Sequence, residues 1–217
     1  MPEVGTEILR RLLESALQYA ESQDAEYVRA TTPALEPYVT TYKQAGFSPL
    51  RRDFRIAWDL DALDYEGSSF KIRELQSEMV GRAAESCVES LHPWWDWRTE
   101  EHGGPSAMAH SFEDGMKRGE KWLACQVENR MVGLAGLNPD YGKATARFRG
   151  AYVLPSYRGR GIGSALMKEI MKLARQLGKR RTVVYTFSYL DRLAPGASLY
   201  LKSGGKIEAE YLQLQMK

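Results

Sequence analysis

A glycine-rich turn between an extended run and a helical run is the clearest candidate for chemistry in this sequence. Residues 153–167 read VLPSYRGRGIGSALM, with glycines at the alternate positions 159, 161 and 163. Glycines let the backbone approach a ligand closely and take conformations that a Cβ forbids. The helix expected after them directs its free N–H groups and the positive end of its dipole at the turn. The turn is therefore predicted to bind an anionic group such as a phosphate.

Two common phosphate-binding patterns fit this turn poorly. A P-loop needs a Lys after its last glycine, whereas Gly163 is followed by Ser164. A dinucleotide-binding fingerprint needs Gly-x-Gly-x-x-Gly and a carboxylate at the end of the next strand. Here the third glycine is out of register, and the strand expected at residues 182–188 holds no Asp or Glu. A nucleotide-binding oxidoreductase is therefore disfavoured.

The pattern that fits is Arg158-x-x-Gly161-x-Gly163, preceded by Val-x-Pro and followed by an apolar helix. It resembles the acetyl-CoA pyrophosphate loop of the GCN5-related N-acetyltransferases, the GNAT superfamily. Residues 195–205 (PGASLYLKSGG) are similar to the family's A-x-x-L-Y-x-x-x-G-F segment, although Gly205 stands where the family usually has an aromatic residue. Two motifs at the family spacing favour this resemblance over an ordinary strand–turn–helix.

The resemblance implies an α/β fold, with a central, mostly antiparallel sheet of six or seven strands that splays between strands four and five, and with a bulge in strand four. From residue 68 onward, the alternating and amphipathic runs fit a complete GNAT domain spanning residues 68–217. Strands are expected at 70–75, 121–128, 131–137, 146–153 and 182–188, and helices at 78–91 and near 106–118. Residues 128–130 are expected to form a hairpin turn.

The first sixty residues repeat the end of the chain at a constant shift of 158 positions. Tyr42 falls on Tyr200 and Gly46 on Gly204 without a gap, and the apolar positions of the first helix match those of the helix after the glycine turn. Residues 1–62 are therefore interpreted as the C-terminal half of a second GNAT unit, without a cofactor site of its own. Such a half-unit should pack against the complete domain or against another subunit, so a homodimer is possible.

The resemblance also implies a cofactor, acetyl-CoA, and a set of binding residues. The backbone at 152–154 would pair with the pantetheine arm, and the amides of 160–164 would hold the pyrophosphate. The cofactor-binding candidates are Tyr152, Val153, Leu154, Arg158, Gly159, Arg160, Gly161, Ile162, Gly163 and Ser164. Tyr200 matches the family's general acid, and a phenol that is protonated at neutral pH suits that role. The alternative for Tyr200 is a tyrosine that only fills the groove.

The general base stays open, because the fourth expected strand holds no carboxylate. The options are a water held by backbone carbonyls, the hydroxyl of Tyr152, or a carboxylate from another element. The carboxylates eligible by type are Glu100, Glu101, Glu113 and Asp114.

Residues 92–102 (HPWWDWRTEEH) lie where the family usually builds acceptor specificity, between the first and second helices of the domain. Tryptophans beside carboxylates can bind a cationic or aromatic amine, which makes Trp94, Trp95, Trp97 and Glu100 substrate-binding candidates. Packing against the core or a dimer contact explains the tryptophans equally well. The three histidines match no zinc spacing, so no metal is expected.

Together these features predict an acetyl-CoA-dependent N-acetyltransferase, in which a primary amine of a small molecule, peptide or protein attacks the thioester directly in a ternary complex. The alternative is a catalytically inactive acyl-CoA-binding or regulatory module. The missing strand carboxylate, Gly205 and the degenerate repeat favour that alternative.

Composition adds further expectations. A net charge of +2 over 217 residues gives no argument for nucleic acid or membrane partners. The two cysteines make neither a disulfide framework nor a metal spacing, and no signal or membrane-spanning run is visible. A cytoplasmic protein is therefore expected.

Overall fold

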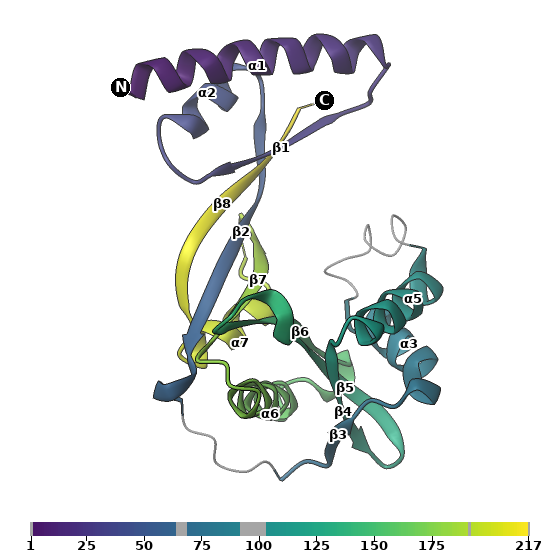
Figure 1. The fold of residues 1–217 in the computed structure, drawn as a ribbon. Coiled ribbons are helices and arrows are strands. Elements are labelled where there is room, and N and C mark those ends of the chain that lie inside the picture. Colours follow the sequence, from purple (N-terminus) through teal and green to yellow (C-terminus); the bar gives the residue numbers. More distant parts are fainter. Residues whose placement is uncertain (1, 64–68, 92–102, 191, 217) are drawn as a thin grey trace. The chain divides into compact units, whose positions relative to one another are not determined.

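A computed structural model describes residues 2–63, 69–91, 103–190 and 192–216 (Figure 1). Within them, eight strands form one mixed sheet in the order β1-β8-β2-β7-β6-β5-β4-β3. The strands are β1 (Val28–Pro33), β2 (Ser48–Asp59), β3 (Ile72–Glu74), β4 (Lys121–Val127), β5 (Arg130–Asn138), β6 (Thr145–Val153), β7 (Arg181–Tyr189) and β8 (Lys206–Met216). The helices are α1 (Pro2–Ser22), α2 (Tyr38–Gln44), α3 (Val80–Leu91), α5 (Gly104–Lys117), α6 (Ile162–Gln176) and α7 (Pro195–Lys202).

The predicted α/β fold with a mixed sheet is confirmed. β3 pairs antiparallel with β4, β4 with β5 and β5 with β6. β6 pairs parallel with β7 at Thr145–Arg147. Six strands come from residues 68–217, and the N-terminal segment adds β1 and β2. The predicted hairpin between β4 and β5 is also present, because Glu128 and Asn129 have φ angles of 49° and 63°, as a tight hairpin turn requires.

The chain divides into two compact units that cut across its strands. The first unit comprises Met1–Arg55, Tyr185–Ala197 and Ile207–Lys217. The second unit comprises Ile56–Val184 and Ser198–Lys206. Each unit is described by itself below.

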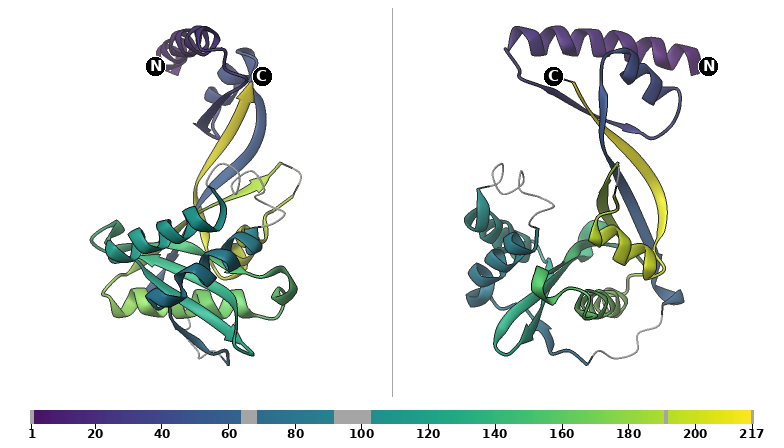
Figure 2. Two further views of the ribbon diagram at one scale, coloured as in Figure 1. Left: turned by 90° about the vertical axis from the view of Figure 1, so that its right-hand side faces the viewer. Right: turned by 180° about the vertical axis from the view of Figure 1, so that it is seen from behind.

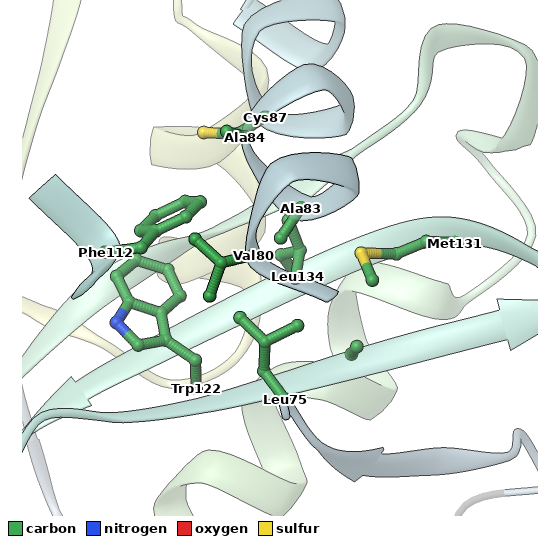
Figure 3. Close-up of a cluster of buried hydrophobic side chains, with 10 residues drawn as sticks. Leu75, Val80, Ala83, Ala84, Cys87, Phe112, Trp122, Met131 and Leu134 are labelled. Carbon is green, nitrogen blue, oxygen red and sulfur yellow. The ribbon is translucent and has the colours of Figure 1, made fainter. Parts of the chain in front are cut away.

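In the second unit, helices cover both faces of the strands that lead to the glycine turn. Figure 2 shows α3 and α5 on one face of β4–β6 and α6 on the other. Buried side chains of α3 and α5 join those of β4 and β5 in one cluster, in which the rings of Phe112 and Trp122 lie 4.4 Å apart (Figure 3). On the other face, α6 buries the apolar stripe that its periodicity predicts: Ile162, Leu166, Ile170, Met171 and Ala174.

The first unit has a core of its own, built from Leu13, Val39, Phe47, Leu212 and Leu214. β1 pairs antiparallel with β8 along its whole length, from Val28 opposite Met216 to Pro33 opposite Tyr211. Among the described residues, none of the helices combines the length and the apolar character that crossing a membrane requires.

Candidate functional site

The glycine turn connects β6 to α6, as the sequence predicts. Gly159 and Gly161 have φ angles of +74° and +84°, which L-residues with a Cβ rarely adopt. Gly161 caps α6 without a side-chain hydrogen bond, and its carbonyl accepts the first helical bond, from Ala165. The amides of Ile162, Gly163 and Ser164 therefore have no acceptor inside the helix. They form the helix terminus that an anion such as a pyrophosphate fits.

Gly163 brings this helix terminus close to the neighbouring helix. A Cβ at Gly163 would lie 3.1 Å from Leu199 Cδ2 and 3.7 Å from Val153 Cγ2. The absent side chain thus lets the start of α6 pack between β6 and α7, the helix that carries Tyr200.

The side chain of Arg158 bonds to backbone carbonyls. Its Nε donates to the carbonyl of Val153 at 3.1 Å, and its Nη2 donates to the carbonyl of Ser90 at 2.5 Å. Ser90 lies in the last turn of α3, where carbonyls lack helical partners and attract cations. Burial lowers the pKa of Arg158. Arg158 therefore fastens the glycine turn to α3, whereas the guanidinium of Arg160 lies over the ring of Tyr157 at 5.1 Å.

Near the glycine turn, successive backbone N–H groups of β6 point alternately toward β5 and toward Tyr200 of α7. The N–H of Leu154, just after β6, donates to the carbonyl of Val132 in β5, and the N–H of Ala151 points the other way and donates to the hydroxyl of Tyr200. Because N–H groups alternate along a strand, the N–H of Val153 points to the same edge as that of Ala151. Of the predicted residues 152–154, Val153 therefore presents its amide at the edge away from β5.

A β-bulge interrupts β6 beside Tyr200. Gly136 pairs with Gly150 and Leu137 with Phe148, so Arg149 is the extra residue. Gly150 has a φ of +109°, which suits glycine. A bulge of this kind redirects backbone groups next to it. The bulge that the family resemblance implies for this strand is present, and the N–H of Ala151 immediately follows it.

Tyr200 is 4% exposed and lies at this bulge. Its hydroxyl oxygen accepts the N–H of Ala151 at 3.2 Å, and its ring meets that of Phe148 edge-on, with centroids 5.5 Å apart. Burial raises the pKa of Tyr200, the Ala151 bond opposes this, and the neighbouring Tyr152 adds to it. The phenol therefore keeps its proton, which remains available to an acceptor outside the strand.

Tyr152 lies next to Tyr200. A Cβ on Gly150 would be 3.4 Å from the hydroxyl of Tyr152 and 3.5 Å from that of Tyr200, so the two hydroxyls flank one glycine. The Tyr152 hydroxyl donates to the carbonyl of Arg149 at 3.0 Å, and its ring stacks on Trp122 at 6.4 Å. Two phenols thus meet at the bulge.

Glu120 is a buried carboxylate at the bulge that the sequence reasoning missed. It immediately precedes β4, is 7% exposed, and its Oε1 lies 3.5 Å from Nε of Arg149. A signal was present, because Glu120 is two residues before Trp122 and so shares its buried face. The carboxylates of Glu113 and Asp114, both eligible by type, are exposed on α5.

The predicted acceptor-binding residues Trp94, Trp95, Trp97 and Glu100 lie outside the described residues, as does Glu101. His110 is described and exposed on α5, where its Nδ1 is 2.9 Å from the carbonyl of Ser106. In the part of the chain that the structure describes, no three His, Cys, Asp or Glu residues gather as metal ligands would.

Comparison with known proteins bears directly on this site. The model of the Acetyltransferase (GNAT) family matches residues 88–204, more than half of the chain. That range contains the glycine turn, the bulge, Glu120 and Tyr200. No curated protein matches the sequence significantly.

Solved structures show the same fold at low identity. A GCN5-related N-acetyltransferase from Sphaerobacter thermophilus is 17% identical, with 94% of this chain and 67% of that one covered, at a TM-score of 0.73. A tandem GNAT protein from the clavulanic acid biosynthesis pathway is 15% identical, with 95% and 68% covered, at a TM-score of 0.67. The PaiA N-acetyltransferase from Thermoplasma acidophilum, in complex with coenzyme A, is 19% identical, with 69% and 99% covered, at a TM-score of 0.55.

Proposed function

Because the chain belongs to the acetyltransferase (GNAT) family, we propose that it transfers an acetyl group from acetyl-CoA to a primary amine of a small molecule, peptide or protein. The amine attacks the thioester directly while both substrates are bound. One observation carries the proposal: the buried Tyr200 lies at a bulged strand edge, where its hydroxyl accepts the N–H of Ala151 and where burial raises its pKa.

Acetyl-CoA fits the glycine turn on chemical grounds, and it supplies the acetyl group in activated form as a thioester. The amides of Ile162, Gly163 and Ser164, which have no acceptor inside the helix, receive the pyrophosphate, with Arg160 beside them as a cation. The N–H of Val153 offers the pantetheine arm a strand-like bond at the edge of β6. The coenzyme A complex of the Thermoplasma protein supports this assignment.

Tyr200 acts as the general acid in this proposal. Burial holds a proton on its hydroxyl, and that proton passes to the departing sulfur. The hydroxyl of Tyr152 flanks the same glycine, and its oxygen can accept a hydrogen bond from the amine. The proton that the amine loses passes to water, and water returns a proton to the phenolate of Tyr200. Glu120 is paired with Arg149, and we assign it the role of fixing the bulge.

We also propose that residues 1–62 are an incomplete second GNAT copy. The series α1–β1–α2–β2 has the same order of elements as α6–β7–α7–β8. Shifted by 158 positions, the last residue of α2 falls on Lys202, where α7 ends, and the first residue of β2 falls on Lys206, where β8 begins. The tandem GNAT structure among the similar folds is consistent with such a duplication.

The competing function is a binding module that holds acyl-CoA without turnover. Two observations favour it. β6 carries no carboxylate, and the segment 195–205 ends in Gly205 where the family usually has an aromatic residue. Release of free CoA, measured with polyamines, aminoglycosides, amino acids and peptides, separates the two. An acetyltransferase turns over at least one class of amine, and Tyr200→Phe lowers that rate. Tight acetyl-CoA binding with no turnover on any amine supports the binding module instead.

A further inference from the structure

The position after Gly204 has no room for a side chain in this domain. A Cβ on Gly205 would lie 2.6 Å from Ile56 Cγ2, 2.9 Å from Trp58 Cε2 and 2.7 Å from the carbonyl oxygen of Tyr200. Distances this short are not tolerated between a Cβ and its neighbours. The space beside Tyr200 is therefore already filled, and the side chains that fill it come from β2 of the N-terminal segment.

Trp58 is the largest of these neighbours, and it is 2% exposed. Its indole meets the ring of Tyr200 edge-on, with centroids 5.8 Å apart and planes at 84°. It meets Phe148 in the same manner at 6.3 Å. Its Nε1–H donates to the carbonyl of Ser203 at 3.3 Å, just after α7. Trp58 thus contacts the ring of Tyr200 and also donates a hydrogen bond to the backbone just after α7, the helix that carries Tyr200.

The N-terminal repeat has an aromatic residue at the position that corresponds to Gly205. The 158-residue shift places Phe47 on Gly205 and Tyr42 on Tyr200. Phe47 is 3% exposed, and its ring meets that of Tyr42 edge-on, at 5.4 Å and 89°. In this repeat an aromatic residue packs on the tyrosine five positions before it. In the complete domain that position is glycine, and the ring comes from β2.

The N-terminal repeat also receives a side chain from the last strand of the complete domain, as the complete domain receives Trp58 from β2. The same shift places Trp58 on Met216, near the end of β8. The sulfur of Met216 lies 3.2 Å from the Cβ position of Gly46, and its side chain packs on the cluster that holds Phe47. Each repeat thus receives, beside its tyrosine motif, an apolar side chain from the terminal strand of the other.

We propose that Trp58 is the positioning residue for Tyr200, so that the N-terminal segment completes the active site of the C-terminal domain. The inference rests on the proposed role of Tyr200 as general acid. The edge-on indole restricts the tyrosine ring and excludes water from one of its sides, which keeps the hydroxyl at the N–H of Ala151. Residues 1–62, outside the family match, therefore contribute to kcat.

A double-mutant cycle on the full-length chain tests this inference. Trp58→Ala is expected to lower kcat by roughly 10- to 100-fold at a KM for acetyl-CoA within about threefold of wild type, because the acid is misplaced while the cofactor loop is intact. Trp58→Phe retains an aromatic ring and is expected to restore most of kcat. In a Tyr200→Phe background, Trp58→Ala should cause no further loss, because it acts through the missing hydroxyl.

Phe54→Ala is the matched control, because it removes a buried aromatic side chain from the same strand but within the first unit. All rates are normalised to the folded fraction from urea unfolding. The inference is overturned if Trp58→Ala lowers kcat no more than Phe54→Ala, or lowers it equally in the Tyr200→Phe background. If Tyr200→Phe alone leaves kcat unchanged, the role of Tyr200 fails first, and the proposed mechanism fails with it.

Discussion

The hydroxyl oxygen of Tyr200 lies 3.2 Å from the backbone nitrogen of Ala151 and accepts its N–H. This bond joins α7 to β6 directly after the bulge at Arg149. It fixes the phenol at the edge of a strand, and the buried site keeps the phenol neutral. A hydroxyl held by a backbone donor has its own hydrogen left to give, which is the property a general acid needs.

Tyr200→Phe is expected to lower kcat by roughly 100-fold or more while the KM for acetyl-CoA stays within about threefold. The ring and its packing remain, so the change removes the proton donor and leaves the N–H of Ala151 without its acceptor. That unpaired N–H is expected to cost about 1–3 kcal/mol of unfolding free energy. Steady-state CoA release and urea unfolding measure the two effects. A kcat within about twofold of wild type would remove Tyr200 from the mechanism.

The pKa of Tyr200 sets a second expectation, in alkaline solution. Its ordinary pKa is 10.0, and burial raises the value in the folded chain. Above about pH 10 the unfolded chain releases a proton that the folded chain retains, so stability is fully present below that pH and declines as the pH rises further. Tyr200→Phe should remove this part of the alkaline decline. Urea midpoints of both proteins at about pH 9 and pH 11 measure it. Parallel declines would contradict it.

Arg158→Lys should disturb the glycine turn and α3 together. A lysine keeps the charge but cannot donate to the carbonyls of Val153 and Ser90 in the fixed geometry of a guanidinium. The residues expected to bind the amine, 92–102, directly follow α3 in the sequence. We therefore expect the KM for acetyl-CoA and the KM for the amine each to rise by about 3- to 10-fold, which corresponds to a loss of about 1 kcal/mol in the binding of each substrate. Arg160→Lys is the control, since Arg160 lies over Tyr157 and should affect acetyl-CoA alone. An effect of Arg158→Lys on acetyl-CoA alone would show that the tie to α3 has no functional role.

Gly136→Ala tests the packing that supports Tyr152. A Cβ there would lie 2.7 Å from the ring of Trp122, which stacks on Tyr152. Overpacking of this kind is expected to lower the unfolding free energy by about 1–3 kcal/mol. Gly81→Ala makes the same change in open space on α3 and should stabilise the protein by about 0.5–1 kcal/mol. Equal urea midpoints for the two variants would contradict this account.

The local features of this fold could be predicted from the sequence. The order of strands and helices from residue 68, the hairpin at Glu128 and Asn129, and the start of α6 at the glycine turn depend on periodicity and turn chemistry within short windows. Tyr200 could be located because it lies at a fixed distance from the glycines that follow it in its motif.

The missed features depend on contacts between residues far apart in the sequence. Arg158 stays a predicted pyrophosphate ligand, but its bond to the carbonyl of Ser90, 68 residues earlier, depends on where α3 ends. The burial of Glu120 follows from its alternation with Trp122, but its ion pair with Arg149 depends on the bulge in β6. Gly205 departs from the motif where a Cβ would meet Ile56 and Trp58, and the strand order decides that these two side chains lie there. Periodicity shows which face of a strand is buried, but it does not show which strand lies next to it.

The pairing of β1 with β8 has a consequence for how the protein is made. Val28 is opposite Met216, so the first strand finds its partner only once the ribosome has synthesised the chain through β8. Until then the apolar residues of the N-terminal segment have no completed sheet to cover them. Pairings between such distant residues form slowly and leave newly made chains open to aggregation. A nascent chain of this protein should therefore depend on chaperones more than its size suggests.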